Sequence, residues 1–468
     1  MICRKMNRLP LSSCLAAALW LAPGLMQAQT TPELREILDR LQKLEESNRA
    51  LTDEVHSLRQ ELASAHAPAP APAAPAVAAE HTDEQAGVEK ARVEEMAQSK
   101  VESSEKLPIR ITGMALFNTY LNGRYNGGVE NTTIAPLTPG DATGGGTLRQ
   151  SILGFEYNSP QSVLGAKITG SLNLDLFGGS SNSLDHLVRL RTASIAFNWE
   201  NTSILFGQEK PIISPRDPNS FAQVGYSPLT DAGNLWLWQP QIRLEQRVRF
   251  SNNFGLRAQV GVVQTRELGS ESNGYNSYVP PPASLTLAVE HPEPGVEGRF
   301  ELWRQWGENT RIEIAPGFHY NASTVGRFDV PSHLFTVDWL IKPVKFVEWT
   351  GFFYNGQNIA NLGALPQGFV FSQYYGTHPV PSIGGWTQLR FPVTERLAFD
   401  IYGGTQDDQN AELRLGYVGS NRAYAANVMY RLAPNVIVSA EAGQVRTFYL
   451  GPGLRLNNHY DLAVAYLF

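Results

Sequence analysis

Polar and apolar residues alternate along much of the chain after residue 107. In the segment WLWQPQIRLEQRVRF (236–250), the odd positions from Gln239 to Arg249 are polar, and most even positions are large and apolar. Successive side chains of a β-strand leave opposite faces of the sheet, so this period of two predicts a strand with one polar and one apolar face. Such a strand fits a soluble sandwich with a dry core, or a barrel that separates lipid from water.

Connection lengths favour the barrel. Short turns such as NSP, ENT, SNN, KP, PVTE and AP alternate with long connections, and the long ones are 122–147, 209–235, 267–295 and 356–383. Transmembrane barrels have short periplasmic turns and long outer loops. We place SLTLAVE (284–290) in an outer loop, because one more strand would break the even count that leaves both barrel ends on the periplasmic side.

The pattern predicts an all-β transmembrane barrel of about sixteen antiparallel strands over residues 107–468. The expected strands are 109–121, 148–157, 164–176, 188–199, 202–208, 236–250, 254–266, 296–305, 310–320, 332–341, 344–355, 384–391, 396–405, 414–431, 435–448 and 459–468.

The N-terminus predicts export. Residues 1–28 have basic residues, then the apolar run LAAALWLAPGL, then Ala28, which is typical of a cleaved signal peptide. The two cysteines, Cys3 and Cys14, lie in this segment, so the mature chain has no thiol chemistry. A lipoprotein box ending at Cys14 is the alternative, although almost no apolar stretch precedes it. After this segment the sequence has no run of about 18 apolar residues, which is the length that would predict a membrane helix.

The C-terminal segment YDLAVAYLF resembles the last strand of bacterial outer-membrane barrels, which the assembly machinery reads as a signal. Leu467 is the exception to its alternation. A closed barrel has no unpaired edge, so it is the form of sheet that lipid tolerates. The residues expected on the lipid face are Tyr460, Leu462, Val464, Tyr466 and Phe468.

Residues 32–64 predict a periplasmic α-helical coiled coil, because apolar residues recur at spacings of three and four. Asn48 takes an a position, which fixes register at some cost in stability. The number of helices stays open, and a single helix packed on its own domain is the alternative. The residues expected to mediate oligomerisation are Leu34, Ile37, Leu41, Leu44, Asn48, Leu51, Val55, Leu58 and Leu62.

Composition separates the linker from the barrel. Residues 65–106 begin with the proline–alanine spacer HAPAPAPAAPAVAA and continue charged and polar. The span 32–106 has 16 acidic and 9 basic residues, whereas 107–468 has 28 and 26 and is nearly neutral. Nothing in this distribution indicates nucleic-acid binding.

The polar parity of 236–250 places a row of arginines on the inner wall of a sixteen-stranded barrel, whose lumen is water-filled. Such a row concentrates anions, and arginine binds carboxylates in a bidentate way. Internal ion pairs with Glu245, Glu156 and Asp175 are the alternative, which would leave no selectivity. In strand 188–199 the parity conflicts, so a bulge or a covering loop must intervene. The predicted pore-lining residues are Lys167, Arg189, Arg191, Arg243, Glu245, Arg247, Arg249 and Arg257.

Loop 209–235 lies between the fifth and sixth expected strands, where trimeric porins fold a loop inward to narrow the pore. Its prolines make it stiff and unsuitable as a strand. Lys210, Arg216 and Asp217 are the candidate constriction residues.

Motifs for catalysis are lacking. The sequence has no G-x-S-x-G, H-E-x-x-H or phosphate-binding loop, and 270–274 has serine where outer-membrane phospholipases have the histidine of H-x-S-N-G. We therefore expect neither an enzyme nor a cofactor. Asp407, Asp408 and Glu412 could hold a divalent ion between lipopolysaccharides, but a solvated loop is the preferred interpretation, so no metal site is predicted.

Five segments resemble the DcaP-like porins, outer-membrane channels of the dicarboxylate-uptake type: RQSILGFEYNSP (149–160), LVRLRTASIAF (187–197), ILFGQ (204–208), WQPQIRLEQ (238–246) and the terminal AYLF. The resemblance implies a homotrimer in outer-membrane lipid and lipopolysaccharide, a three-stranded periplasmic coil, and passage of small organic anions. The basic lining of the family is matched at Arg189, Arg191, Arg243 and Arg247.

Two other functions fit parts of the sequence. A sugar channel would need tryptophans in the lumen, but Trp236 and Trp238 have the parity opposite to the arginines and are interpreted as a membrane-interface anchor. A structural tether would extend the coil toward the cell wall and use the barrel only to hold it in the membrane.

Overall fold

The computed structural model describes residues 108–178, 186–264, 294–325, 328–372 and 376–468. The chain divides into two units, Met1–Ala78 and Ala79–Phe468, and every described residue belongs to the second. The predicted signal peptide, coiled coil and linker, and the segment 284–290, lie outside the described residues.

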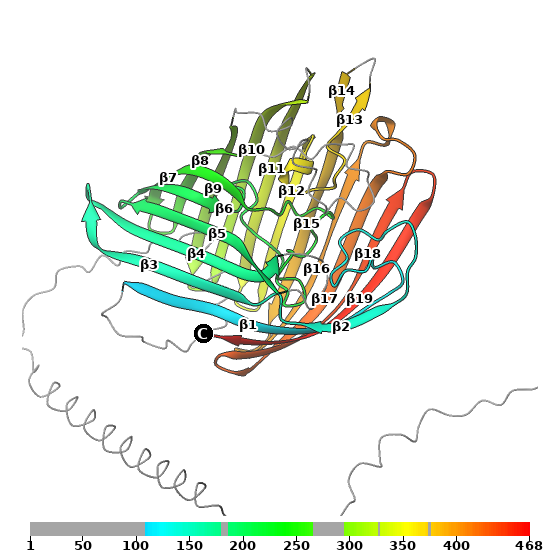
Figure 1. Cartoon of the computed structure of the whole chain (residues 1–468). Helices are drawn as coiled ribbons and strands as arrows, with labels where there is room; N and C mark the ends of the chain where they lie inside the picture. Colours follow the sequence, from blue (N-terminus) through cyan, green and yellow to red (C-terminus); the bar gives the residue numbers. More distant parts are fainter. Residues whose placement is uncertain (1–107, 179–185, 265–293, 326–327, 373–375) are drawn as a thin grey trace, which may run out of the picture. The chain divides into compact units, whose positions relative to one another are not determined.

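One antiparallel sheet closes on itself (Figure 1). The first strand, β1 (Ile109–Asn122), pairs with the last, β19 (Gly453–Leu467), on one side and with both β2 (Thr143–Thr147) and β3 (Ile152–Val163) on the other. β2 and β3 together form one wall strand, so the closed barrel has sixteen strands, as predicted. No helix in the described ranges is long and apolar enough to cross a membrane.

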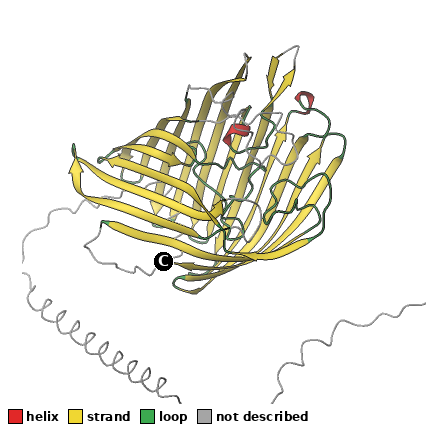
Figure 2. Cartoon of the chain, viewed as in Figure 1, coloured by secondary structure: helices red, strands yellow, loops and turns green. Residues whose placement is uncertain are grey.

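The remaining wall strands follow one another in chain order around the barrel (Figure 1), and strands make up its wall (Figure 2). They are β4 (Ala166–Gly178), β5 (Leu187–Asn198), β6 (Thr202–Glu209), β7 (Gln239–Ser251), β8 (Phe254–Val263), β9 (Gly295–Gly307), β10 (Thr310–Val325), β11 (Phe328–Val344), β12 (Val347–Gln357), β15 (Pro381–Pro392), β16 (Leu397–Asp408), β17 (Val418–Ala433) and β18 (Val436–Tyr449). The short elements are the 3₁₀ turns η1 (Ala360–Leu362) and η2 (Asn410–Glu412) and the hairpin β13 (Phe369–Ser372) and β14 (Gly376–Pro379).

Two predicted turns are misplaced. The NSP segment stays inside β3, which continues past a bulge to Val163, and the chain reverses at Leu164 and Gly165 with φ of 51° and 78°. These left-handed conformations suit a tight hairpin turn. The KP segment likewise belongs to β11, and the turn follows at 345–346. Turn residues inside a strand misled the prediction, because strand pairing overrides local preference.

The wall has the two faces that the alternation predicts. On β7, Gln241 and Arg243 are buried inside, whereas Ile242 and Leu244 are exposed on the outside. β19 alternates in the same way, with Tyr460, Leu462, Val464, Tyr466 and Phe468 all exposed. Leu467, the exception in the sequence, points inward and packs in a small buried cluster with Met114 and Phe221.

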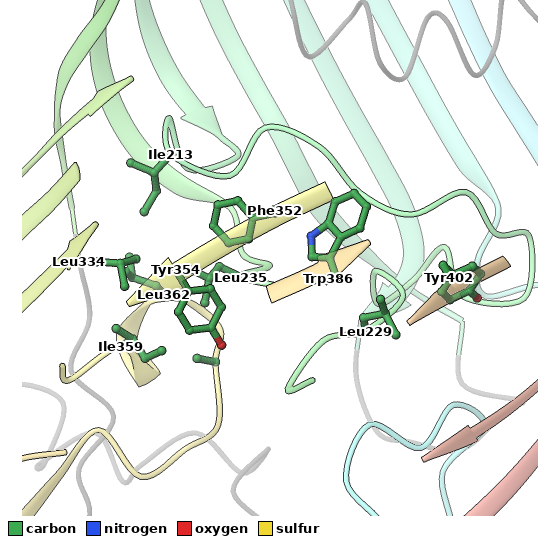
Figure 3. Packing of buried hydrophobic residues seen from close by; sticks show 11 residues of the cluster. Ile213, Leu229, Leu235, Leu334, Phe352, Tyr354, Ile359, Leu362, Trp386 and Tyr402 are labelled. Atoms are coloured by element: carbon green, nitrogen blue, oxygen red, sulfur yellow. The ribbon is translucent and has the colours of Figure 1, made fainter. Parts of the chain in front are cut away.

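Part of the barrel interior is apolar, which corrects the expectation of a polar, water-filled lumen throughout. Phe352, Tyr354, Trp386 and Tyr402 point inward from β12, β15 and β16 and pack against residues of two loops (Figure 3). The loop residues in this interior cluster are Ile213, Leu229, Leu235, Ile359, Leu362 and Ala364, and Leu334 of β11 completes it. Any aqueous passage must therefore run past this cluster.

Candidate channel lining

The connection between β6 and β7, residues 210–238, folds into the barrel. Its backbone is held by side chains from distant wall strands: the Ile212 amide donates to Glu297 of β9 at 2.7 Å, and the Asn219 amide donates to Gln388 of β15 at 2.8 Å. The Ser220 hydroxyl donates to Glu441 of β18 at 2.6 Å. We call residues 210–238 the inner loop, and it crosses the lumen as the sequence suggested for 209–235.

Gln150 fixes the inner loop on the opposite side. Its Oε1 accepts hydrogen bonds from the amides of Val224 and Gly225 at 2.6 and 2.8 Å, and its Nε2 donates to the Ala222 carbonyl at 2.9 Å. Gln150 lies in the interruption between β2 and β3. Sequence reasoning did not select it, because one glutamine between two strands gives no distinctive signal.

The three candidate constriction residues hold the inner loop in place. Lys210 pairs with Asp217 at 2.5 Å within the loop. Arg216 reaches the wall, where it pairs with Glu313 of β10 and lies 3.1 Å from Asp338 of β11. Lys210, Arg216 and Asp217 are thus all engaged in ion pairs that stiffen the loop. Their contribution to solute passage stays a prediction.

A network of ion pairs covers the inner face from β7 to β11. Arg299 of β9 is fully buried and binds Glu301 at 3.0 Å and Asp338 at 2.7 Å. Arg257 of β8 also pairs with Glu301. The sequence prediction included Arg257 but not its partners, although the alternation of Glu297, Arg299 and Glu301 with apolar residues could have revealed them.

The arginine row of β7 gathers around an acid. Arg247 lies 2.7 Å from Glu245, and Arg243 and Arg257 interact electrostatically with the same carboxylate. Arg243 is buried, Arg247 is half-buried, and Arg249 is exposed. These arginines therefore form ion pairs inside the barrel. Such internal pairing is the alternative to anion binding that the sequence left open.

A β-bulge resolves the conflicting parity of β5. Asn173 of β4 is opposite Thr192, but its neighbour Leu174 is opposite Leu190, so Arg191 is the extra residue. The bulge lets Arg189 and Arg191 face inward while Ile195 further along the strand faces outward.

Asp175 of β4 receives both arginines of β5. It lies 2.6 Å from Arg189 and 3.1 Å from Arg191. Glu156, the third acid considered from the sequence, pairs instead with Arg110 at 2.6 Å near the other end of the wall. Lys167 is exposed and has no ion pair with any described residue.

Trp236 and Trp238 pack inside the barrel, which corrects their interpretation as a membrane-interface anchor. The Arg189 guanidinium lies 4.9 Å from the Trp238 ring and that of Arg191 lies 4.8 Å from it, and the two tryptophan rings contact each other edge to face. Tyr226 contacts Trp236. Both tryptophans precede β7, which begins at Gln239, so the strand parity does not extend to them.

An acidic arc lies on the inner face of β16 to β19, and the sequence prediction missed it. Asp400, Glu441 and Asp461 are buried there, and Glu441 is directly opposite Asp461 in the sheet. Neutral groups bind two of these carboxylates: Tyr402 donates to Glu441 at 2.7 Å and Asn118 donates to Asp461 at 3.1 Å. Asp400 lies 3.8 Å from Arg390 of β15. The basic residues of β5 to β8 therefore have an acidic counterpart elsewhere on the wall.

The solved structures that share this architecture include the following two. The outer membrane channel DcaP of Acinetobacter baumannii is 13% identical, with a TM-score of 0.61 over 77% of this chain and 97% of that one. An anion-selective porin from Comamonas acidovorans is 10% identical, with a TM-score of 0.52 over 77% of this chain and 99% of that one. The barrel has a porin fold. No protein-family model and no curated protein matches the chain.

Within this porin fold, a second inward connection covers β17 to β19. Residues 123–142 bind the wall through the Ala135 amide, which donates to Thr447 at 2.9 Å, and through the Ala135 carbonyl, which accepts from Tyr449 at 2.9 Å. Glu130 in this connection pairs with Arg149 at 3.3 Å, and burial raises the pKa of the Glu130 carboxyl.

Metal binding has no support among the described residues of this porin fold, where no group of three or more histidine, cysteine or acidic side chains is placed to hold an ion. Asp408 points inward and is bound by Ser382 at 2.6 Å, whereas Asp407 is exposed. Of the three acids considered for a divalent ion, Asp407 and Asp408 thus face opposite sides of the wall.

Proposed function

We propose that the protein is a porin that forms a passive channel for small solutes in the bacterial outer membrane. The single observation that carries this proposal is the inner loop, because a closed barrel with an apolar outside needs an inward-folded segment only if its interior is to be narrowed and shaped. The orientation, with long connections outside and the coiled coil in the periplasm, and the homotrimer follow from the resemblance to DcaP-like porins.

Small organic anions, such as dicarboxylates, are the proposed solutes. Many inward arginines have acidic partners, so the preference would depend on the groups that keep access to water. Lys167 and Arg249 are exposed on the inner parity of β4 and β7, and neither has an ion pair with a described residue. A confined positive potential at these positions would raise the local concentration of anions.

The test is planar-bilayer conductance of the purified protein under a salt gradient. We expect a reversal potential that indicates anion preference, and the Lys167→Gln, Arg249→Gln double variant should shift it toward zero. The matched control is Arg396→Gln, Lys345→Gln, which removes two charges from the short turns at the same end of the barrel. Cation preference would contradict the anion proposal, and a protein without any conductance would favour the tether.

A sugar channel is the second candidate, and the interior position of Trp236 and Trp238 favours it. Aromatic rings that stand in a polar lumen offer flat apolar surfaces beside hydrogen-bonding groups. Here the rings are already stacked with Arg189 and Arg191. Current measurements with added malto-oligosaccharide and with added succinate separate the two candidates, because the solute that binds in the channel should interrupt the current.

A further inference from the structure

Two arginines lie next to each other on the outward face of the barrel. Arg422 of β17 is directly opposite Arg446 of β18, and both side chains are exposed on the apolar parity of their strands. Residues directly opposite in an antiparallel sheet have Cβ atoms about 4.5–5.5 Å apart, and like charges there are destabilising. Neither arginine has an ion pair with any residue that the structure describes, so no described acidic group offsets this repulsion.

Polar side chains surround the two arginines in a connected set. Arg446 donates to Gln444 at 2.5 Å and lies 5.7 Å from the ring of Tyr424, whose hydroxyl also donates to Gln444. Gln444 in turn donates to Asn458 of β19 at 2.6 Å. We call Arg422, Tyr424, Gln444, Arg446 and Asn458 the outer arginine cluster. These hydrogen bonds hold Arg446 in one orientation on a surface that is otherwise suited to lipid.

A groove adjoins the cluster on the same strands. It begins at the next outward-facing residue of each strand. Ala426 follows Tyr424 on β17, Ala442 precedes Gln444 on β18, and Tyr460 follows Asn458 on β19. These three residues line an open groove of about 780 Å³, whose other apolar walls include Phe399 and Leu462. The small alanine side chains leave the space, and the larger residues on both sides enclose it.

The position along the strands places the cluster on the outer side of the membrane in the proposed orientation. β17 follows the long connection after β16, and the short turn between β17 and β18 lies at the opposite, periplasmic end. The outer arginine cluster is therefore near the outer headgroups, and the groove points from it toward the middle of the membrane.

We propose that the outer arginine cluster and this groove form a binding site for a phosphorylated glycolipid of the outer leaflet, of the lipid A type. The two guanidiniums bind a phosphate, for which arginine has matching bidentate geometry. Gln444 and Asn458 offer hydrogen bonds to the sugar, and an acyl chain fills the groove. The inference rests on the outer-membrane placement of the proposed function, but not on conduction or selectivity.

Charge complementarity favours a phosphorylated glycolipid over the other possible occupants of this site. A second copy of the chain would have to bring acidic groups to the two arginines, and an unphosphorylated lipid would leave both uncompensated. A phosphate relieves the repulsion between Arg422 and Arg446 by binding both, and the adjoining groove is apolar as acyl chains require.

The experiment compares the full-length protein with an Arg422→Ala, Arg446→Ala variant in detergent. Binding is measured as the shift in melting temperature on titration with diphosphoryl lipid A and with a dephosphorylated lipid A of the same acylation. Each basic side chain at an anionic membrane surface contributes about 1 kcal/mol, so the double variant should bind the diphosphoryl form about 30-fold more weakly. The dephosphorylated form should bind both proteins equally weakly.

Two variants make the test specific. The control is Arg304→Ala, Arg396→Ala, which removes an outward-facing arginine of β9 and a turn arginine at the periplasmic end and should leave lipid A binding unchanged. Ala442→Phe fills the groove and should weaken binding while both arginines remain.

Three results would overturn the proposal. The first is equal binding of diphosphoryl lipid A by the wild-type protein and the Arg422→Ala, Arg446→Ala variant. The second is equal binding of the two lipid forms by the wild-type protein. The third is dissociation of a wild-type oligomer in the double variant without lipid, which would make the cluster a subunit interface. Channel conductance, measured on the same samples, reports separately on the proposed function.

Discussion

Two arcs of the inner wall contrast. From β7 to β11 the wall is built of ion pairs around the buried Arg299, and on β12, β15 and β16 an apolar arc gathers around Phe352 and Trp386. The inner loop contacts both, through Arg216 on the charged arc and Ile213 on the apolar arc. The charged arc fixes where the loop lies, because ion pairs have strict geometry, whereas the apolar arc supplies non-directional burial.

The two arcs should respond differently to the loss of one side chain. In the charged arc, the buried carboxylates that paired with a deleted arginine keep fewer cationic partners. In the apolar arc, a deleted side chain leaves a cavity, and its cost grows with the volume removed and depends on how far the surroundings relax.

The largest effect is expected for Arg299→Met, which keeps the side-chain volume but removes the charge. Glu301 and Asp338 each lose a partner at about 3 Å, although Glu301 keeps Arg257 and Asp338 keeps Arg216. Breaking a buried ion pair costs about 3–5 kcal/mol, and these remaining partners place the expected cost at the lower end of that range. Urea unfolding of the refolded barrel in detergent micelles measures this free energy. Arg110→Met is the control, because Arg110 pairs with Glu156 in an exposed position and should change stability by less than about 1 kcal/mol.

Equal destabilisation by Arg299→Met and Arg110→Met would contradict the special position of the charged arc. A triple replacement of Arg299, Glu301 and Asp338 by apolar residues sharpens the point. It should not recover the lost stability, because it also takes Glu301 from Arg257 and Asp338 from Arg216.

The second effect tests the apolar arc through its loop residue Leu362, which is fully buried in the interior cluster. Leu362→Ala should cost about 2–3 kcal/mol, at the lower end for a leucine truncation, because loop residues can partly close the cavity. The same urea unfolding measures it. Leu415→Ala, at a residue that is 84% exposed, should change stability by less than about 0.5 kcal/mol. An equally small effect of Leu362→Ala would show that the cluster does not stabilise the barrel.

The contrast between the arcs also explains how much of the molecule the sequence could predict. Strands and their faces were predictable where the two sides meet different surroundings, as at Ile242 and Arg243 on β7. The period of two then directly reflects which side chain is inside. On β12, Phe352 points inward and Phe353 outward, so both faces are apolar and no alternation marks the interior cluster.

The inner loop shows the other limit of prediction from sequence. Its position between the fifth and sixth wall strands and its prolines suggested a stiff inward segment. Its partners, such as Glu297, Gln388 and Gln150, come from parts of the wall far apart in the sequence, and no local pattern encodes such contacts. The same holds for Trp236 and Trp238, whose orientation is set by stacking on Arg189 rather than by the strand that follows.

The smallest effect concerns the connection 123–142, which joins neither arc. Glu130 is buried beside Arg149, and the net result of burial is a pKa raised above the usual 4.5. A carboxyl whose pKa is higher in the folded protein binds more protons there than when unfolded, so stability falls as pH rises from about 4.5 through the folded value. Hydrogen exchange of the amides in 123–142 should therefore show easier local opening at pH 7 than at pH 4, after correction for the intrinsic exchange rate.

Glu130→Gln should remove this pH dependence, because the amide keeps the shape of the side chain but does not titrate. Glu412→Gln, in the turn η2 on the same side of the barrel, is the matched control and should leave it intact. Opening that becomes harder toward pH 7 in the wild-type protein would show that the Arg149 pair, rather than burial, dominates at Glu130. The connection would then follow the rule of the charged arc, where an arginine partner outweighs the cost of burying an acid.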